Sequence, residues 1–258
     1  MPQDLSVAVL TDVHGNAFAI QAVVLAIEAE RPDLTVNLGD QVWGQADPMT
    51  ALEVQRSLGA LEVRGNNDER LTLPGEQLSS AHRKLQNWLA RQLPAHERQR
   101  LATLPMTVTL ADGAVLAAHG TPTSAWDSLL LSWDGQTFAH RPEADVLERL
   151  NLPEAVEVVL VGHMHRESTR HVGGRLLVNV GPVAYQNDGD PRARWALLTR
   201  RRGVWTVQHH RVEYDTRAAA RWMAANHAPH LEEAELHLRP VTDPIRNAAF
   251  LSNEAAQE

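Results

Sequence analysis

The sequence predicts an α/β fold in which two packed sheets carry helices on their outer faces. Its N-terminal part alternates short apolar segments with segments of helical periodicity, which is typical of a parallel sheet. After residue 156, short strand-like segments follow one another across glycine-containing turns, which indicates an antiparallel or mixed sheet. The chain has 258 residues, of which 43% are hydrophobic and 22% charged, an ordinary composition for a globular protein.

The N-terminal elements are expected in the order strand, helix, strand, helix, strand. Asn16 is suited to capping the first helix, and Asp47 followed by Pro48 is a typical start for the second. The apolar spacing places the strands at residues 5–10, 34–38 and 61–63 and the helices at residues 16–30 and 48–58. This alternation predicts that the three strands lie parallel in one sheet.

The rest of the chain is expected to hold further helices, a hairpin and a series of strands. Residues 76–104 have helical character that Pro94 divides in two, and Ala111-Asp112-Gly113 is a hairpin signal. The strands are placed at residues 106–110, 114–118, 156–161, 168–172, 175–180, 194–199 and 204–211, and a helix at 214–227. Beyond residue 231 the pattern weakens, which predicts a short helix followed by disorder.

The amino-acid composition restricts the classes of function that are open to this chain. No apolar segment reaches the roughly 18 residues that a membrane span needs, and no basic start followed by an apolar stretch indicates a signal peptide, so a cytoplasmic location is expected. The net charge of −8 argues against a surface for long nucleic acids. Without cysteine, any bound metal must be held by histidine, aspartate, glutamate or asparagine, which favours manganese, iron, zinc or nickel.

Polar residues that can bind metal follow the ends of several predicted strands. They are Asp12, His14, Asp40, Asn66, His119, His163 and His165. Sites in open α/β sheets form at the carboxyl ends of the strands, so these residues are expected to converge. In extended backbone, residues i and i+2 point to the same side, so Asp12 and His14 could hold one ion jointly. Asp40, a single carboxylate after a glycine, is suited to bridging two cations.

Taken singly, these residues have structural alternatives. Asp12 and His14 could cap the helix that follows, and His119 could be an ordinary histidine at a strand end. Asn66 could occupy a left-handed turn beside Gly65. The remaining histidines considered, His82, His96, His140 and His209, are expected at the surface. The occurrence of all the motifs in one order favours a metal site.

Five stretches of the chain resemble one protein family in combination. They are residues 11–16 (TDVHGN), 38–40 (LGD), 63–68 (VRGNND), 118–122 (AHGTP) and 161–165 (VGHMH), with a glycine-containing segment at 179–183 and 188–193 in addition. They resemble the calcineurin-like metallophosphoesterases, specifically the small bacterial and archaeal phosphodiesterase branch related to diadenosine-tetraphosphatase-like proteins. The resemblance covers about residues 5–212.

The resemblance implies a fold and a division of the chain. The expected fold is a four-layered α/β/β/α sandwich of two mixed sheets flanked by helices. Residues 1–212 would form the metallophosphoesterase domain. Residues 213–258 would form a C-terminal helix and tail that pack on this domain or extend from it.

The resemblance also implies the roles of the metal-binding residues. The first ion would be held by Asp12, His14, Asp40 and His165. The second would be held by Asp40, Asn66, His119 and His163, with Asp40 bridging, and Asp40, Asn66 and His119 would act in catalysis. Two divalent transition metal ions, manganese before iron, zinc or nickel, would activate a bridging water, and the resulting hydroxide would attack phosphorus in line.

The expected substrates are small phosphate esters, with phosphodiesters or nucleotides preferred. The alternatives are a phosphomonoesterase, a dinucleoside polyphosphate hydrolase or, in another class, a non-catalytic scaffold with the same fold. Residues 121–135 follow His119 and could overhang the site. Trp126 or Trp133 could then stack on a base, or both could pack beneath a surface loop.

One position departs from the family pattern. Many members carry histidine directly after the asparagine ligand, where it resembles a general acid for the leaving group, but this chain has Asn67. An amide cannot deliver a proton, and such assistance is typically worth about 10²–10⁴-fold in rate. The departure predicts a preference for leaving groups that need little protonation, such as phenolates or nucleoside phosphates. Arg64, Asp68 and His82 are conceivable substitutes for the missing general acid.

Overall fold

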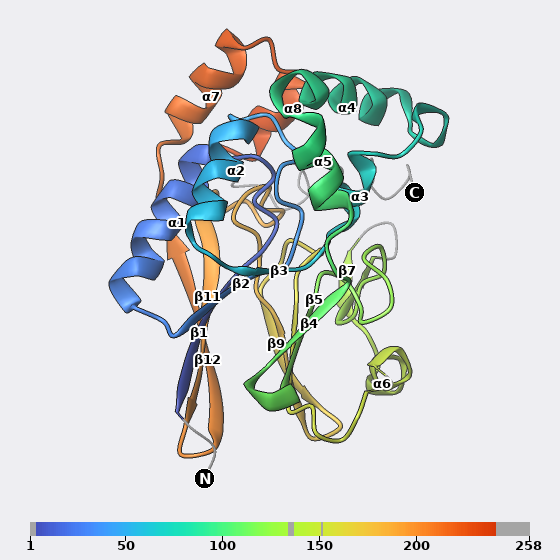
Figure 1. Cartoon of the computed structure of the whole chain (residues 1–258), viewed down its shortest axis with the longest axis vertical. Helices are drawn as coiled ribbons and strands as arrows, with labels where there is room; N and C mark the ends of the chain where they lie inside the picture. Colours follow the sequence, from blue (N-terminus) through green and yellow to red (C-terminus); the bar gives the residue numbers. More distant parts are fainter. Residues whose placement is uncertain (1–3, 134–136, 151, 241–258) are drawn as a thin grey trace.

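Two five-stranded sheets lie face to face in the computed structural model, which describes residues 4–133, 137–150 and 152–240 (Figure 1). The strand order is β12-β11-β1-β2-β3 in the first sheet and β4-β5-β8-β10-β9 in the second. Helices lie outside both sheets. The predicted α/β fold with two mixed sheets flanked by helices is confirmed.

The first sheet is parallel in its N-terminal half and antiparallel at its other edge. Its strands are β1 (Leu5–Leu10), β2 (Leu34–Asn37), β3 (Leu61–Glu62), β11 (Ala193–Arg201) and β12 (Val204–Val212). β2 runs parallel to β1 and to β3, as predicted, whereas β11 pairs antiparallel with β1 from Leu5↔Arg200 to Val9↔Ala196. The late strands were expected to form a sheet of their own. Instead, β11 and β12 cover the open edge of β1.

The second sheet is mixed. Its strands are β4 (Thr107–Leu110), β5 (Val115–Ala118), β8 (Val158–Val161), β9 (Ser168–Val172) and β10 (Arg175–Asn179). β5, β8 and β10 are parallel, while β4 and β9 flank them in antiparallel pairs. The turn of the predicted hairpin is a short 3₁₀ helix, Ala111–Gly113.

The inner faces of the two sheets form the main core. Fully buried valines of β1 and β2 pack with buried residues of β5, β8 and β10, including Val115, Val158 and Val178. Each fully buried aliphatic side chain of this kind stabilises the fold by about 1.5–3 kcal/mol. This core fixes the two sets of strand ends relative to each other.

Helices cover the outer faces and the carboxyl ends of the strands (Figure 1). α1 (Ala17–Glu30) packs Ile20, Val23 and Ile27 against the outer face of the first sheet, and Asn16 caps it through a 3.0 Å hydrogen bond from Ala19 N. α6 (Glu143–Leu150) packs against the second sheet. The other α-helices of six or more residues in the described part of the chain are α2 (Pro48–Ser57), α4 (Ser80–Gln92), α5 (Ala95–Ala102), α7 (Thr216–Ala225) and α8 (Leu231–Leu236).

Several short elements differ from the predictions. The helix expected from residue 76 begins at Ser80, where Ser79 caps it, after a 3₁₀ turn at Gly75–Gln77, although Pro94 does separate α4 from α5. The structure adds α3 (Asn66–Arg70), β6 (Leu131–Trp133) and β7 (Phe138–His140), along with α6.

The C-terminal predictions are tested only in part. The short helix predicted beyond residue 231 is α8, while the tail at 241–258, for which disorder was predicted, lies outside the described residues. In the part of the chain that the structure describes, no helix is long and apolar enough to cross a membrane. The cytoplasmic location stays a prediction.

Candidate metal centre

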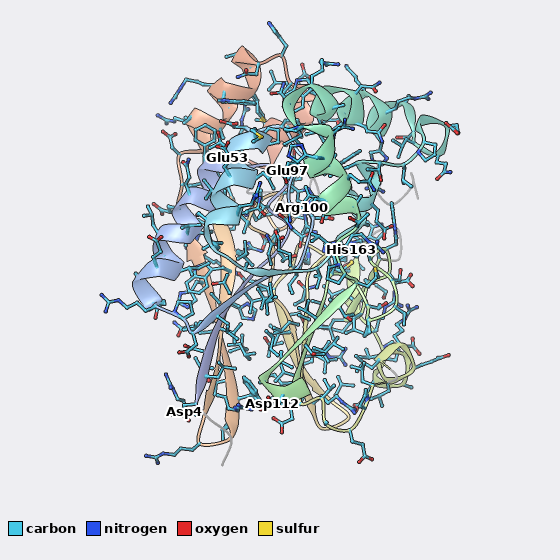
Figure 2. All side chains as sticks on the ribbon, viewed as in Figure 1. Asp4, Glu53, Glu97, Arg100, Asp112 and His163 are labelled. Atoms are coloured by element: carbon cyan, nitrogen blue, oxygen red, sulfur yellow. The ribbon has the colours of Figure 1, made fainter. Side chains whose placement is uncertain are left out.

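The structure brings all seven predicted metal ligands together where the strands of both sheets end. The first sheet contributes Asp12 and His14 after β1, Asp40 after β2, and Asn66 at the start of α3 after β3. The second contributes His119 after β5 and both His163 and His165 after β8, and His163 lies at these strand ends in Figure 2. Oxygen donors therefore come from the first sheet, and most of the imidazoles come from the second.

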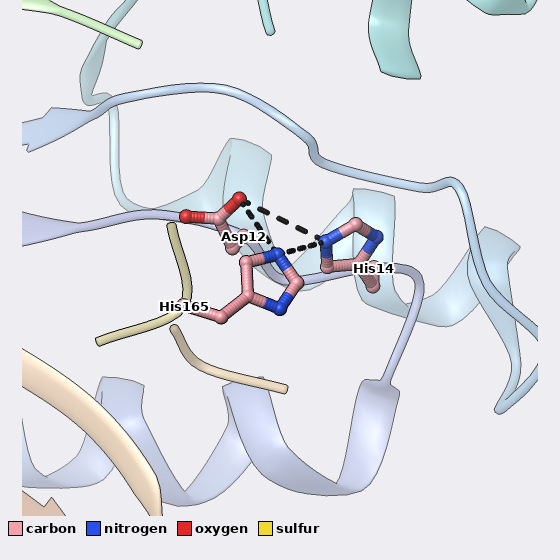
Figure 3. A group of neighbouring side chains, drawn as sticks. All are labelled: Asp12, His14 and His165. Carbon is pink, nitrogen blue, oxygen red and sulfur yellow. Dashed lines mark hydrogen bonds and ion pairs between the residues drawn. The ribbon is translucent and has the colours of Figure 1, made fainter. Parts of the chain in front are cut away.

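The first cluster consists of Asp12, His14 and His165 (Figure 3). The Nε2 atoms of His14 and His165 lie 3.0 Å apart, and Asp12 Oδ1 lies 3.8 and 3.3 Å from them. Among the described residues this buried oxygen has no hydrogen-bond partner. The other oxygen of Asp12 is held by Thr11 Oγ1 at 2.8 Å and His163 N at 3.1 Å. Two imidazole nitrogens that converge on a buried carboxylate oxygen without a hydrogen-bond partner form a donor set that fits a bound cation.

The second cluster consists of Asp40, Asn66, His119 and His163. Asn66 Oδ1 lies 3.0 Å from His119 Nε2 and 3.1 Å from His163 Nδ1. Asp40 Oδ2 lies 3.5 Å from His119 Nε2 and 3.7 Å from His14 Nε2 of the first cluster. Asp40 therefore lies between the two clusters, where a bridging ligand is expected.

Backbone carbonyls fix the tautomer of three imidazoles. A carbonyl oxygen can only accept a hydrogen bond, so the Nδ1 atom that faces it carries the proton and Nε2 presents a lone pair to the site. The partners are Trp43 O for His14 at 2.8 Å, Leu38 O for His119 at 2.8 Å and Tyr185 O for His165 at 2.6 Å. Three rings are thus oriented as neutral nitrogen donors toward the clusters.

The electrostatics of the site favour a cation. Burial would lower the pKa of His14 and of His119, but Asp12 and Asp40 outweigh it and raise both. Burial and the neighbouring His119 lower the pKa of His163 to about 4. For Asp12 and Asp40, burial is outweighed by the imidazoles, which lower the pKa of both carboxyls. The two buried carboxylates stay ionised and attract positive charge, whether protons or metal ions.

Five of the predicted ligands have left-handed backbone conformations. This corrects the prediction that Asp12 and His14 converge because their backbone is extended; they converge because the chain turns sharply after β1. Aspartate and histidine tolerate this region better than most residues, yet each such residue costs about 1–3 kcal/mol and such strain collects at functional sites. The φ values are 54° at Asp12, 47° at His14, 56° at Asp40, 68° at His163 and 50° at His165.

Two glycines of the motifs make room for the carboxylates. A Cβ atom at Gly65 would overlap Asp40 Oδ1 and the Asp40 backbone nitrogen. One at Gly162 would overlap Thr11 Oγ1 and come within 2.8 Å of Asp12 Oδ2. Any side chain at these positions would displace a predicted ligand.

Helix α3 anchors the second cluster. Asn66 is its first residue and does not occupy the left-handed turn that was the structural alternative. Asp68 accepts backbone N–H groups of Asp40 at 2.9 Å, Gln41 at 3.0 Å and Gly65 at 2.9 Å. Burial and the charge of Asp40 raise the pKa of Asp68 to about 7. The sequence predicts Asp68 only as a possible proton donor; its position as the third residue of a helix that starts at a ligand is the signal for this anchoring role.

Asn67 points at the shared carboxylate. Its Nδ2 donates to Asp40 Oδ2 at 2.6 Å and its backbone N to Asp40 Oδ1 at 2.8 Å. Arg70 Nη1 donates to Asn67 Oδ1 at 2.6 Å, which fixes the orientation of the amide. The residue at the family's general-acid position is therefore a hydrogen-bond donor to Asp40 in this chain.

The segment after His119 lies against α3. Trp126 Nε1 donates to Glu69 Oε2 at 2.6 Å, and the guanidinium of Arg70 lies 4.6 Å from the centre of the Trp126 ring. Trp133 packs on Phe138 with ring centres 4.7 Å apart. Both tryptophans are engaged in packing, which favours the structural alternative over base stacking.

The other histidines lie apart from the site. His96 and His140 are exposed, as predicted. His82 is half-buried with its ring centre 6.1 Å from that of Trp43. His209 is also half-buried, 2.9 Å from Thr169 Oγ1 of β9, so the side chains of His82 and His209 are only partly at the surface.

The chain is similar to a family model, to two crystal structures and to a curated protein. A family model described as the calcineurin-like phosphoesterase superfamily domain matches residues 5–203. The crystal structure of a metallophosphoesterase from Sphaerobacter thermophilus is 26% identical, with a TM-score of 0.70, and the match covers 91% of this chain and 98% of that one. A hypothetical protein from Pyrococcus horikoshii is 18% identical with a TM-score of 0.75 and the same coverages. An uncharacterized protein of Methanocaldococcus jannaschii is 23% identical over 86% of this chain and 93% of its own length.

Proposed function

The chain belongs to the calcineurin-like phosphoesterase superfamily, and we propose that it hydrolyses small phosphate esters with two bound divalent metal ions, phosphodiesters or nucleotides being preferred. The observation that carries the proposal is the pair of adjacent ligand clusters with Asp40 Oδ2 between them, 3.5 Å from His119 Nε2 and 3.7 Å from His14 Nε2.

The donor atoms fit such ions. The first cluster offers one carboxylate oxygen and two imidazole nitrogens, and the second offers carboxylate and amide oxygens with two imidazoles. Oxygen and imidazole donors without thiolate suit manganese, iron, zinc or nickel, and manganese is the first choice. When bound, two such ions supply an activated water and neutralise charge on the phosphate.

The chain's own residues orient these donors. The carbonyls of Trp43, Leu38 and Tyr185 keep the protons of three rings on Nδ1, so that Nε2 faces the clusters. Removal of a hydrogen bond that orients a metal-binding histidine typically weakens metal affinity by about 10–100-fold. The site would therefore hold its ions in a fixed geometry.

Asn67 shapes the choice of substrate. Its amide cannot release a proton, and its Nδ2 is turned toward Asp40. A leaving group that needs protonation, such as an alkoxide, would receive no help at this position. We therefore infer that activated phosphodiesters and nucleotide anhydrides are better substrates than alkyl monoesters.

The scaffold alternative is the less favoured one. A scaffold that has lost catalysis has no need to keep seven donor side chains in one place, yet here all of them converge, with Asp12, Asp40 and His119 at 1% exposure or less. Buried carboxylates side by side are costly unless a cation or proton offsets them.

A single experiment tests the proposal. The protein is stripped with a chelator and reconstituted with Mn²⁺, its bound metal is counted, and its activity is screened on monoesters, diesters, cyclic nucleotides and dinucleoside polyphosphates. We expect two ions per chain and hydrolysis of at least one diester or nucleotide class. A protein that retains no ions and hydrolyses none of these substrates would support the scaffold instead.

A further inference from the structure

Tyr185 touches both imidazoles of the first cluster. Its carbonyl oxygen accepts from His165 Nδ1 at 2.6 Å, and its ring meets the His14 ring edge-on, with centres 5.0 Å apart. Its backbone has a φ of 62°, which is unusual for a bulky residue. A strained residue persists only where its surroundings hold it in place.

One direct contact and one indirect contact to Tyr185 come from the C-terminal arm, which we define as residues 213–240 with helices α7 and α8. The ring of His237 packs on the Tyr185 ring with centres 4.6 Å apart, and His237 Nδ1 lies 3.2 Å from Gln186 O. The Tyr185 hydroxyl hydrogen-bonds Gln45, whose Nε2 in turn donates to Pro229 O of the arm at 3.2 Å. The arm thus contacts Tyr185 directly through His237 and indirectly through Gln45, and Tyr185 in turn contacts His14 and His165.

The arm also forms the wall directly beside His14. A narrow cavity, with room for about one water molecule, lies between His14 and the arm. Its arm-side lining is Met223, Ala234, His237 and Leu238, and the opposite side includes His14, Gln45 and Tyr185. The cavity is too small for a nucleotide or sugar, so substrate does not fit between His14 and the arm.

We propose that the C-terminal arm is a working part of the metal centre: His237 holds Tyr185, and Tyr185 holds His14 and His165 as ligands of the first ion. This inference rests on the proposed metal-dependent function. The family model ends at residue 203, so the arm lies beyond the matched domain. Tyr185 and His237 are positioning residues, because they act through His14 and His165.

A purely structural role of the arm is the alternative. α7 and α8 bury Ala219, Met223 and Ala234 in a cluster with Trp88 and Leu89 of α4, so loss of the arm would disturb packing as well. Truncation cannot separate the two roles. Point variants can, because Tyr185 and His237 contact the site while Trp222 packs on Trp88 with ring centres 6.3 Å apart.

The test compares Mn²⁺ affinity in Tyr185→Ala, His237→Ala and His237→Phe with that of the wild type. Affinity is measured by competition with a chelator, and the melting temperature is measured without metal. We expect Tyr185→Ala to weaken one of the two ions by about 10–100-fold, and His237→Ala to weaken the same ion by about tenfold. His237→Phe keeps the ring contact and should recover most of the loss. Excess Mn²⁺ should restore kcat in the alanine variants.

Trp222→Ala is the matched control, since it removes a packing contact between α7 and Trp88 of α4 while His237 and Tyr185 keep their own contacts. It should lower the melting temperature yet leave the affinity for both ions unchanged. Wild-type affinity for both ions in Tyr185→Ala and His237→Ala would overturn the proposal, and so would equal weakening in Trp222→Ala. A wild type that binds no ions would instead overturn the proposed function, and this inference with it.

Discussion

The two ligand clusters are similar in chemistry and different in how they are held. His119 of the second cluster is fully buried, and its Nδ1 bonds Leu38 O at the end of a core strand. His165 of the first cluster has a side chain that is 16% exposed, and it bonds Tyr185 O in a loop. His119 is thus held by a strand end that the core fixes. His14 and His165 are held by the loop residues Trp43 and Tyr185, and Tyr185 in turn contacts the C-terminal arm.

This difference has a consequence for the metal ions. Loops open more readily than core strands, because fewer buried contacts hold them. The ion of the first cluster should therefore exchange faster and bind more weakly than the ion of the second. Asp40 lies between the clusters, so changes there should affect both ions, whereas changes elsewhere should affect one.

The largest effect is expected for Asp40→Asn. Loss of the shared charge should weaken both ions and reduce kcat/KM by more than about 100-fold, with the protein still folded. Metal content, activity and circular dichroism measure this. Asp112→Asn, in the hairpin turn far from the site in Figure 2, is the control and should change none of them. If the variant keeps two ions and full activity, Asp40 does not bridge the clusters.

Acid should release the metal from both clusters. Metal ions bind neutral imidazole. The pKa of His14 and of His119 is raised above the ordinary value of 6.5, so as the pH falls these rings begin to take up protons, and to lose metal, at a higher pH than an ordinary histidine would. Affinity should fall by about tenfold per pH unit for each ring that takes up a proton. In the second cluster, His163 with its pKa of about 4 should not contribute. Mn²⁺ affinity measured from pH 8 to pH 5 tests this, and a flat profile would argue against histidine ligands.

A smaller and selective effect is expected for Asn67→His beside the second cluster. An imidazole at this position could protonate an alkoxide, so kcat/KM for an alkyl monoester should rise by about tenfold. A nitrophenyl diester, whose leaving group needs no proton, should change little. The control is Asn67→Ala, which removes the bond to Asp40 without adding an acid and should not improve the monoester. Equal gains for both substrates would show that residue 67 does not set leaving-group preference.

Much of the site could be predicted from the sequence because its ligands follow strand ends. The apolar segments of β1, β2, β5 and β8 mark where the chain leaves the sheets, and the ligand types stand directly after them. The left-handed turns at Asp12 and His14 could not be read in this way, since periodicity reports only regular backbone. The return of β11 to β1 and the contact of His237 with Tyr185 join residues far apart in the chain, and only the folded core decides such pairings.

The smallest functional effect is expected away from both clusters, at Glu97 of α5. Its carboxylate accepts from Arg56 Nη1 at 2.5 Å and from Arg100 Nε at 3.0 Å, and both Glu97 and Arg100 are labelled in Figure 2. Burial would raise the pKa of Glu97, but the bond from Arg100 and the charges of both arginines outweigh it and lower the pKa. The ionised carboxylate therefore stabilises the fold above its ordinary pKa of 4.5, and this contribution is lost as the pH falls through the lowered value.

Glu97→Gln should accordingly reduce the free energy of unfolding at pH 7 by about 1–3 kcal/mol, because the arginines lose a charged partner. The difference from the wild type should shrink toward pH 4 and below, and Mn²⁺ affinity should not change at pH 7. Urea unfolding at both pH values measures the first result, and chelator competition measures the second. Glu53→Gln, exposed on α2, is the control and should leave stability unchanged. A loss of metal affinity in Glu97→Gln would mean that general loosening of the helices reaches the clusters. In that case the dependence of the first cluster on Tyr185 would not be specific.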